Sequence, residues 1–228
     1  MPIRMVATDI DGTLTLGRGN LLISTEAVKA IRKLESIGIM VSLVSGNSLP
    51  ITAGLARYIG ASGPSIAENG CVLFYKGEVI HVCRGKPPRR LIEELKEKGF
   101  KESWQNPYRH HDMALYPPPG YDRSLLYELA SRYNVSIYDS GYAIHVQPPG
   151  TGKGAGLREA SKLTGISLEE VLAVGDGLND KPLFDVAGKS ACPSDADPRV
   201  KELVDYVASK PGGLGFAEIA ERVAFRVL

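Results

Sequence analysis

The sequence predicts an α/β fold in which a parallel sheet is flanked by helices, and three observations lead to this prediction. Short apolar runs alternate with helical segments over residues 3–60, and the same rhythm returns after residue 153. Carboxylates follow directly after two of the apolar runs, near residues 9 and 176. Parallel strands are buried on both faces and therefore read as nearly continuous apolar runs, with helices between them. At 228 residues the chain can form one large domain, or one domain with a modest partner.

The first elements follow a β-α-β-α order. Residues 3–10 are an apolar run that ends in carboxylates, which predicts a buried strand. A helix is expected over residues 24–38, because Ser24 or Thr25 can cap its start and Gly38 can end it. A second buried strand is expected at residues 40–44, followed by a helix from 48 to about 60.

The pattern changes near residue 71 and changes back near residue 153. Residues 72–82 read as a hairpin with Gly77 in its turn. Beyond it, residues 82–152 read as a small α+β insert with expected helices at 89–98 and 123–133 and expected strands at 113–116, 135–138 and 143–146. After the insert we expect a helix at 156–163, a strand at 171–174, a further helix and a final helix at 216–227.

The composition and charge of the chain limit the kinds of binding partner that we expect. Lys and Arg number 27 and Asp and Glu 26, a net charge of +1 that gives no electrostatic reason to expect a nucleic acid or an anionic membrane. No run of about 18 apolar residues predicts a membrane span, and no export signal is visible, so we expect a cytoplasmic protein. The three cysteines, Cys71, Cys83 and Cys192, form no C-x-x-C pair and are interpreted as small buried apolar residues.

Carboxylates gather at the expected strand ends. Asp9 and Asp11 lie in the segment Asp9-Ile10-Asp11-Gly12-Thr13, and Asp176 and Asp180 lie in Gly175-Asp176-Gly177-Leu178-Asn179-Asp180. Open α/β sheets place their sites at the carboxyl edge, where paired carboxylates are costly unless a cation or a reaction uses them. Oxygen ligands of this kind suit Mg²⁺, so the two segments predict one magnesium site.

These segments resemble motifs of the haloacid dehalogenase (HAD) superfamily. D-x-D-G-T near the start and G-D-G-x-N-D late in the chain are similar to its first and last motifs. Val44-Ser45-Gly46-Asn47 resembles its phosphate-binding second motif, although Asn47 departs from the Arg often found there, and Lys153 matches its essential lysine. The resemblance covers nearly the whole chain and implies a Rossmann-like HAD core.

Motif spacing places the insert between the second and third motifs. The resemblance thus implies a core of residues 1–81 and 153–228 and an α+β cap of residues 82–152. This arrangement is similar to the Cof-type and sucrose-phosphate-phosphatase-like branch, whose small archaeal members look like phosphoglycolate phosphatases.

The resemblance also implies a role for each site residue. Asp9 is expected to be the nucleophile and a metal ligand. Asp11 is expected to be the general acid and base, with its backbone carbonyl on the metal. The remaining expected residues are Ser45, Gly46, Lys153 and Asn179 for the phosphate and Asp176 and Asp180 for the metal.

The implied function is Mg²⁺-dependent hydrolysis of a phosphate monoester through an aspartyl-phosphate intermediate. The expected partner is a small phosphorylated metabolite, with 2-phosphoglycolate preferred and a sugar phosphate as the alternative; a homodimer is one option for the assembly. A phosphotransferase or mutase and a non-catalytic phospholigand-binding module remain the rival functions. The four histidines are interpreted as structural or surface residues, while His110-His111-Asp112 and Arg109 are secondary candidates for substrate recognition.

Overall fold

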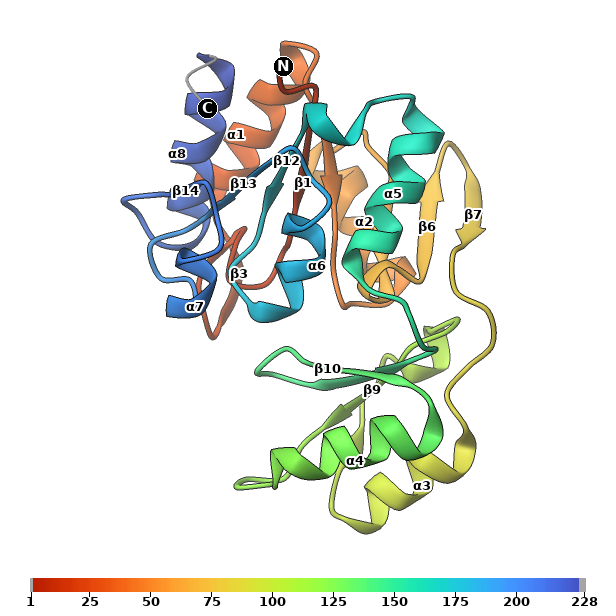
Figure 1. The fold of residues 1–228 in the computed structure, drawn as a ribbon. Helices are drawn as coiled ribbons and strands as arrows, with labels where there is room; N and C mark the ends of the chain where they lie inside the picture. The colour runs from red at the N-terminus through yellow and green to blue at the C-terminus, as the bar shows by residue number, and fades with distance from the viewer. Residues whose placement is uncertain (1, 226–228) are drawn as a thin grey trace.

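A five-stranded parallel sheet forms the centre of the protein. The computed structural model describes residues 2–225. The sheet has the order β14-β13-β12-β1-β4, with all neighbouring strands parallel (Figure 1). The strands are β1 (Met5–Thr8), β4 (Met40–Leu43), β12 (Val171–Val174), β13 (Lys189–Cys192) and β14 (Tyr206–Val207). The predicted α/β fold with a parallel sheet is therefore confirmed.

Helices cover both faces of this sheet, which explains why its strands are apolar throughout. Val6 packs into a core cluster with α1 (Thr25–Ser36) and α8 (Gly212–Ala224). Its neighbours Met5 and Ala7 point to the other face, into a second cluster with α5 (Lys153–Thr164) and α6 (Lys181–Phe184). Successive side chains of a strand alternate between faces, so both faces need apolar residues here. The remaining helices of this part are α2 (Leu49–Ile59) and α7 (Pro198–Lys201).

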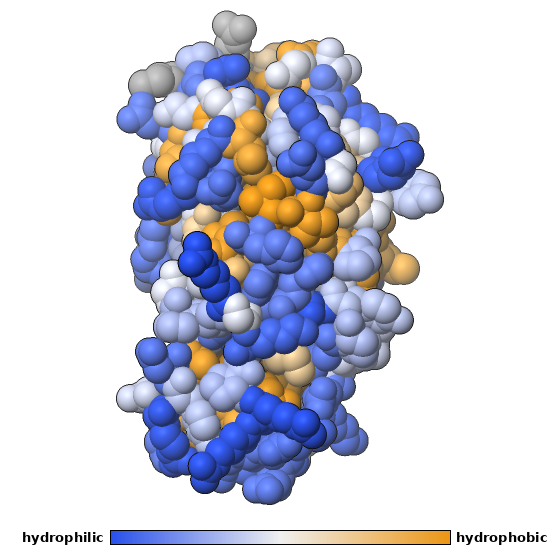
Figure 2. All heavy atoms as spheres, turned by 90° about the vertical axis from the view of Figure 1, so that its right-hand side faces the viewer, coloured by the Kyte–Doolittle hydropathy of each residue, from blue (hydrophilic) through white to orange (hydrophobic). Residues whose placement is uncertain are grey.

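Two antiparallel additions extend the sheet region. The hairpin of β2 (Thr15–Gly17) and β3 (Asn20–Ile23) follows β1 directly. A three-stranded sheet of β5 (Ser65–Ala67), β6 (Val72–Tyr75) and β7 (Glu78–His81) joins the end of β4 through the Val44–Ile66 bridge. Phe74 and Val79 of this sheet are exposed, and the face shown in Figure 2 carries an apolar area within a largely hydrophilic surface.

A second, smaller unit is formed by part of the insert. Its antiparallel sheet has the order β10-β11-β9-β8, from β8 (Lys101–Glu102), β9 (Met113–Tyr116), β10 (Ser136–Asp139) and β11 (Ile144–Gln147). The helices α3 (Arg89–Glu97) and α4 (Arg123–Tyr133) lie on the face of this sheet that points away from the parallel sheet (Figure 1). Leu91, Leu95, Leu115 and Leu129 belong to its own apolar core.

Two helices begin earlier than the sequence predicts. The glycines at their starts lie inside the helices, where they allow close packing against neighbouring segments. The helix expected from residue 156 begins at Lys153, and the helix expected from 216 begins at Gly212. A Cβ atom at Gly156 would lie 2.5 Å from Ile66 Cγ2 and 2.7 Å from Gly70 Cα, so only glycine lets α5 approach β5 this closely. The expected end of the last helix, residue 227, lies outside the described residues. The strands β2, β3, β5, β8, β13 and β14 were not predicted.

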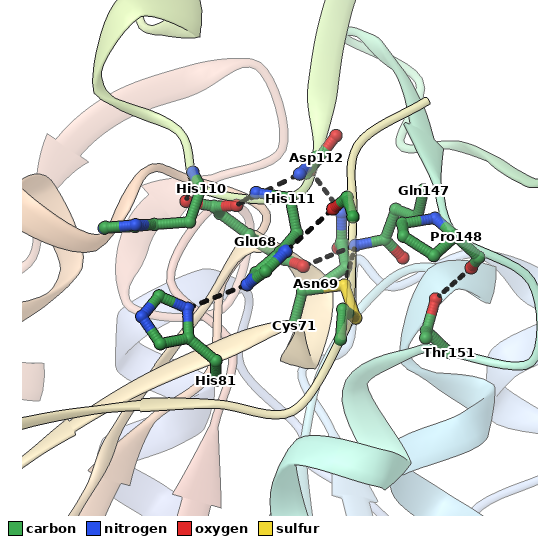
Figure 3. The surroundings of a disulfide bond; sticks show 12 residues. Glu68, Asn69, Cys71, His81, His110, His111, Asp112, Gln147, Pro148 and Thr151 are labelled. Carbon is green, nitrogen blue, oxygen red and sulfur yellow. Dashed lines mark hydrogen bonds between the residues drawn. A yellow bond between two sulfur atoms is a disulfide. The ribbon is translucent and has the colours of Figure 1, made fainter. Parts of the chain in front are cut away.

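The interpretation of two cysteines was wrong. Cys71 and Cys83 form a disulfide, with their Cα atoms 4.7 Å apart (Figure 3). Cys71 precedes β6 and Cys83 follows β7, and the register of this hairpin pairs Val72 with His81, which brings the two cysteines to the same end. Cys192 is buried and unpaired, as expected.

Candidate active site

An acidic cluster forms where β1 and β12 end side by side. The register pairs Thr8 with Val174, so Asp9 and Asp176 follow at the same edge of the sheet. The Asp9 N–H donates to the carbonyl of Val174 at 2.8 Å. One carboxylate oxygen from each of Asp9, Asp176 and Asp180 lies within 4.8 Å of the others, and all three residues are buried. The edge predicted from the sequence thus holds a carboxylate triad.

Lys153 lies beneath this cluster at the first position of α5. Its side chain is 1% exposed, and its Nζ donates to Asp9 Oδ1 at 2.7 Å and also to Asp180 Oδ1. Burial alone would lower the pKa of Lys153, but the carboxylates of Asp180 and Asp9 outweigh burial and raise it. Lys153 is therefore a fixed ammonium inside the cluster.

Asp180 uses both of its carboxylate oxygens within the protein. Oδ1 accepts from Lys153, and Oδ2 accepts from the backbone N–H groups of Asp176 and Gly177 at 3.0 Å each. These contacts fix the loop after β12 and orient the lysine. Asp180 is therefore better suited to contact a cation through water, or to support the other ligands, than to coordinate the cation directly.

Burial, together with mutual repulsion, disfavours the ionised forms of Asp9, Asp11 and Asp176. Burial, followed by repulsion from Asp180, raises the pKa of Asp176 to about 7, although Arg18 and Lys153 lower it. Burial also raises the pKa of Asp9, with Asp180 adding to the effect, and burial raises that of Asp11. A divalent cation would offset this repulsion, and the oxygen donors suit a hard cation.

The loop after β4 brings the second motif to the same edge. Ser45 Oγ accepts from Asn47 N and from Asn47 Nδ2, both at 3.0 Å. Asn47 Nδ2 also donates to Asp11 Oδ2 at 3.0 Å. Asn47, whose role the sequence left open, thus connects the hydroxyl of the second motif to the second carboxylate of the first.

A cavity of about 390 Å³ lies between this edge and the smaller sheet. From the predicted site residues, Asp9, Asp11, Gly46, Asp176 and Asn179 line it. Ser45, Lys153 and Asp180 lie behind these residues at 0–1% exposure. On the wall formed by the hairpin β2–β3, Arg18 Nε lies 3.0 Å from Asp176 Oδ2.

The opposite wall comes from the insert and contains residues that sequence reasoning gave little weight. Trp104, Gln105, Arg109, Tyr116, Tyr142 and His145 line the cavity. The sequence favours a structural or surface role for His145, whereas the structure places it on the cavity wall. His110 is exposed, and His111 bonds to His81 and to the Gly85 carbonyl, both at 2.8 Å, away from the cavity (Figure 3). No local sequence signal distinguishes His145 from the other three histidines.

The fold and this site define a class: an α/β protein with a carboxylate cluster and a buried lysine at the carboxyl edge of its sheet, covered by an inserted α+β unit. The family model for haloacid dehalogenase-like hydrolases matches residues 6–116 and 109–218. The chain belongs to this family of hydrolases, as the motifs indicated.

Proteins similar to this chain in sequence and in structure are consistent with its membership of this family. The chain is 43% identical over 225 residues to a phosphoglycolate phosphatase of Aeropyrum pernix, which covers 97% of this chain and 93% of the relative. It is 38% identical to a phosphoglycolate phosphatase of Metallosphaera sedula, with 96% and 98% covered. A crystal structure from Thermoplasma acidophilum matches with a TM-score of 0.90 at 28% identity, covering 98% and 99% of the two chains.

Among the described residues, no helix has the length and apolar character needed to cross a membrane.

Proposed function

We propose that this protein is a Mg²⁺-dependent phosphate monoester hydrolase that acts through an aspartyl-phosphate intermediate. The observation that carries the proposal is the buried arrangement of Asp9, Asp176 and Asp180 around the ammonium of Lys153 at the floor of a cavity. Three carboxylates and one lysine leave this floor negative, so a dianionic substrate needs further positive charge there.

The donor set fits a magnesium ion. Asp9 and Asp176 would hold it through their carboxylates and Asp11 through its backbone carbonyl. Of the two options for Asp180, contact through water fits better than direct contact, since both of its oxygens accept hydrogen bonds within the protein and Mg²⁺ commonly keeps several waters. A bound Mg²⁺ would supply positive charge that screens the phosphoryl oxygens from the carboxylates. The raised pKa of Asp176 supports this assignment, because burial and then repulsion from Asp180 disfavour its ionised form, which a bound cation would stabilise.

The two carboxylates of the first motif divide the chemistry. An Asp9 carboxylate oxygen attacks phosphorus, and the bond from phosphorus to the leaving oxygen breaks while Asp11 gives that oxygen a proton. Asp11, now ionised, takes a proton from water as the water oxygen attacks phosphorus and the bond from phosphorus to Asp9 breaks. Inorganic phosphate is released, Asp9 returns to a carboxylate and Asp11 to its protonated form. The raised pKa of Asp11 suits its first step, in which it must hold a proton.

The other predicted residues hold the phosphoryl group. Lys153 offers a buried positive charge next to Asp9. Gly46 and Asn179 line the cavity and would offer a backbone N–H and a side-chain amide to the phosphoryl oxygens. Ser45 lies behind Gly46 and accepts two hydrogen bonds from Asn47, which leaves its own hydroxyl hydrogen to donate.

We further propose that residues 82–152 act as a cap on a core of residues 1–81 and 153–228, and that the substrate is 2-phosphoglycolate. The separate apolar core of the smaller unit and its contribution to the cavity wall support the cap assignment. The names of the relatives from Aeropyrum pernix and Metallosphaera sedula support the substrate.

Release of inorganic phosphate from a panel of phosphate monoesters tests the proposal. We expect phosphate and glycolate in equal amounts from 2-phosphoglycolate with Mg²⁺, and none with excess chelator. Asp9→Asn should be inactive, whereas Asp185→Asn, an exposed carboxylate paired with Lys181, should match the parent. A rearranged phosphoester without phosphate release would identify a mutase instead, and metal-independent turnover would contradict the site assignment.

A further inference from the structure

A buried carboxylate in the insert organises the wall opposite the acidic cluster. Asp112 is 0% exposed, and its Oδ2 accepts from His145 Nδ1 at 2.7 Å and from Arg109 Nη1 at 3.0 Å. Asn69 Nδ2 lies 3.5 Å from the same oxygen. Burying a carboxylate requires partners of this kind, so Asp112 is held by three donors from three different segments.

The position of Asp112 is set from the core by Glu68. The Glu68 carboxylate is fully buried and accepts from the backbone N–H groups of His110 and His111 at 2.8 Å and of Asp112 at 3.1 Å (Figure 3). Three backbone donors on one carboxylate fix the segment that carries Asp112. The wall is thus built jointly by both units of the protein.

His145 is the residue that this arrangement aims at the reaction centre. An ionised carboxylate only accepts hydrogen bonds, so the bond to Asp112 places a proton on His145 Nδ1 and leaves Nε2 free. A Cβ atom at Gly46 would lie 3.1 Å from this Nε2, so the ring lies against the phosphate loop. His145 also lines the cavity together with Asp9 and Asp11. Its side chain is 8% exposed.

We propose that His145, positioned by Asp112, contacts the non-phosphoryl end of the substrate and selects substrates that carry a carboxylate there. The inference rests on the proposed function, because it needs the phosphoryl group to lie at Asp9. A substrate whose phosphoryl group lies at Asp9 and Gly46 would extend across the cavity toward the insert, where the imidazole ring of His145 forms part of the wall. To donate to a substrate carboxylate, Nε2 must carry a proton in the complex while Nδ1 keeps its bond to Asp112.

Arg109 and Arg18 are the competing cations of the cavity. The Arg109 Nη1 group is committed to Asp112 and, at 2.8 Å, to the carbonyl of Gly46. Arg18 pairs with Asp176 and is 40% exposed on the hairpin. Arg109 Nε also has no partner among the described residues, but this atom is buried. His145 combines an orientation fixed by Asp112 with a place on the cavity wall beside Asp9 and Asp11, which is why we assign the contact to it.

Steady-state kinetics on two substrates of similar size test this assignment. 2-Phosphoglycolate carries the carboxylate, and 2-hydroxyethyl phosphate carries a hydroxymethyl group in its place. For His145→Gln we expect KM for 2-phosphoglycolate to rise about 10- to 100-fold, as for loss of a charge-assisted hydrogen bond. For 2-hydroxyethyl phosphate, kcat and KM should change less than about threefold. Asp112→Asn should reproduce the pattern, because it weakens the bond that positions the ring; it also weakens the ion pair with Arg109, so His145→Gln is the primary variant.

His110→Gln is the matched control, since it changes the same residue type on the exposed side of the insert. It should leave both substrates unchanged. If Asp112→Asn does not fold, the His145→Gln result decides alone. Three results would overturn the assignment: equal losses on both substrates, no loss on either, or a parent enzyme that does not prefer the substrate with the carboxylate. None of them would contradict the proposed hydrolase function. Loss of the preference in Arg18→Gln but not in His145→Gln would overturn it in favour of the hairpin. A parent protein that hydrolyses no phosphate monoester would instead refute the proposed function.

Discussion

Replacing Asp176 by Asn should stabilise the metal-free protein at pH 8 while removing its response to Mg²⁺. Burial and the neighbouring carboxylates raise the pKa of Asp176 from its ordinary value of 3.8 to about 7. A difference of about three pH units corresponds to about 4 kcal/mol of folding free energy. Because the folded pKa is the higher one, this stability is fully present below about pH 4 and is lost as the pH rises to about 7. Asn carries no charge at any pH, so the variant does not lose this stability as the pH rises.

Denaturant unfolding in excess chelator at pH 4 and pH 8 measures the effect. Asp176→Asn should exceed the parent by about 2–4 kcal/mol at pH 8 and by much less at pH 4, since water entering the cavity reduces the full value. Millimolar Mg²⁺ should raise the stability of the parent at pH 8 but not that of the variant. Asp185→Asn, at an exposed ion pair, should match the parent throughout. A variant less stable than the parent at pH 8, or an equal gain at both pH values, would refute the reasoning.

Three further outcomes follow from the same contacts. Asp9→Asn should lower turnover by about 10³-fold or more without lowering the unfolding temperature, and measurable turnover near the parent level would exclude Asp9 as nucleophile. Gly156→Ala should cost about 1–3 kcal/mol in denaturant unfolding because its Cβ has no room against β5, whereas Gly54→Ala, in open space on α2, should be neutral or stabilising. Asn47→Ala should lower kcat about tenfold by releasing Asp11; an unchanged kcat would show that this bond does not matter.

The acidic floor of the site could be predicted because its causes are local. An apolar run followed by a carboxylate fixes both the strand and the place of the side chain at the sheet edge, as at Asp9 and Asp176. The order of the motifs then gave Lys153, which the structure brings to 2.7 Å from Asp9 across 144 positions of sequence. The glycines near Lys153 hid the true start of its helix, because they serve packing against β5 rather than helix termination.

The opposite wall could not be predicted because its causes are distant in sequence. His145 is distinguished from the other histidines only by Asp112, 33 positions away, and Asp112 is in turn fixed by Glu68, 44 positions earlier. The disulfide was missed for a related reason, since Cys71 and Cys83 meet only through the register of the hairpin between them. Cues that depend on register or on contacts between units are absent from local sequence patterns.

The central claim is that Asp9 becomes covalently bound to the phosphoryl group. Quenching the enzyme during turnover of 2-phosphoglycolate and reducing it with borohydride would convert an aspartyl phosphate to homoserine, which peptide mass spectrometry can locate. We expect homoserine at residue 9, dependent on both Mg²⁺ and substrate, and none in Asp9→Asn. Continued phosphate release with an unmodified Asp9, or with homoserine at Asp11, Asp176 or Asp180, would contradict the account.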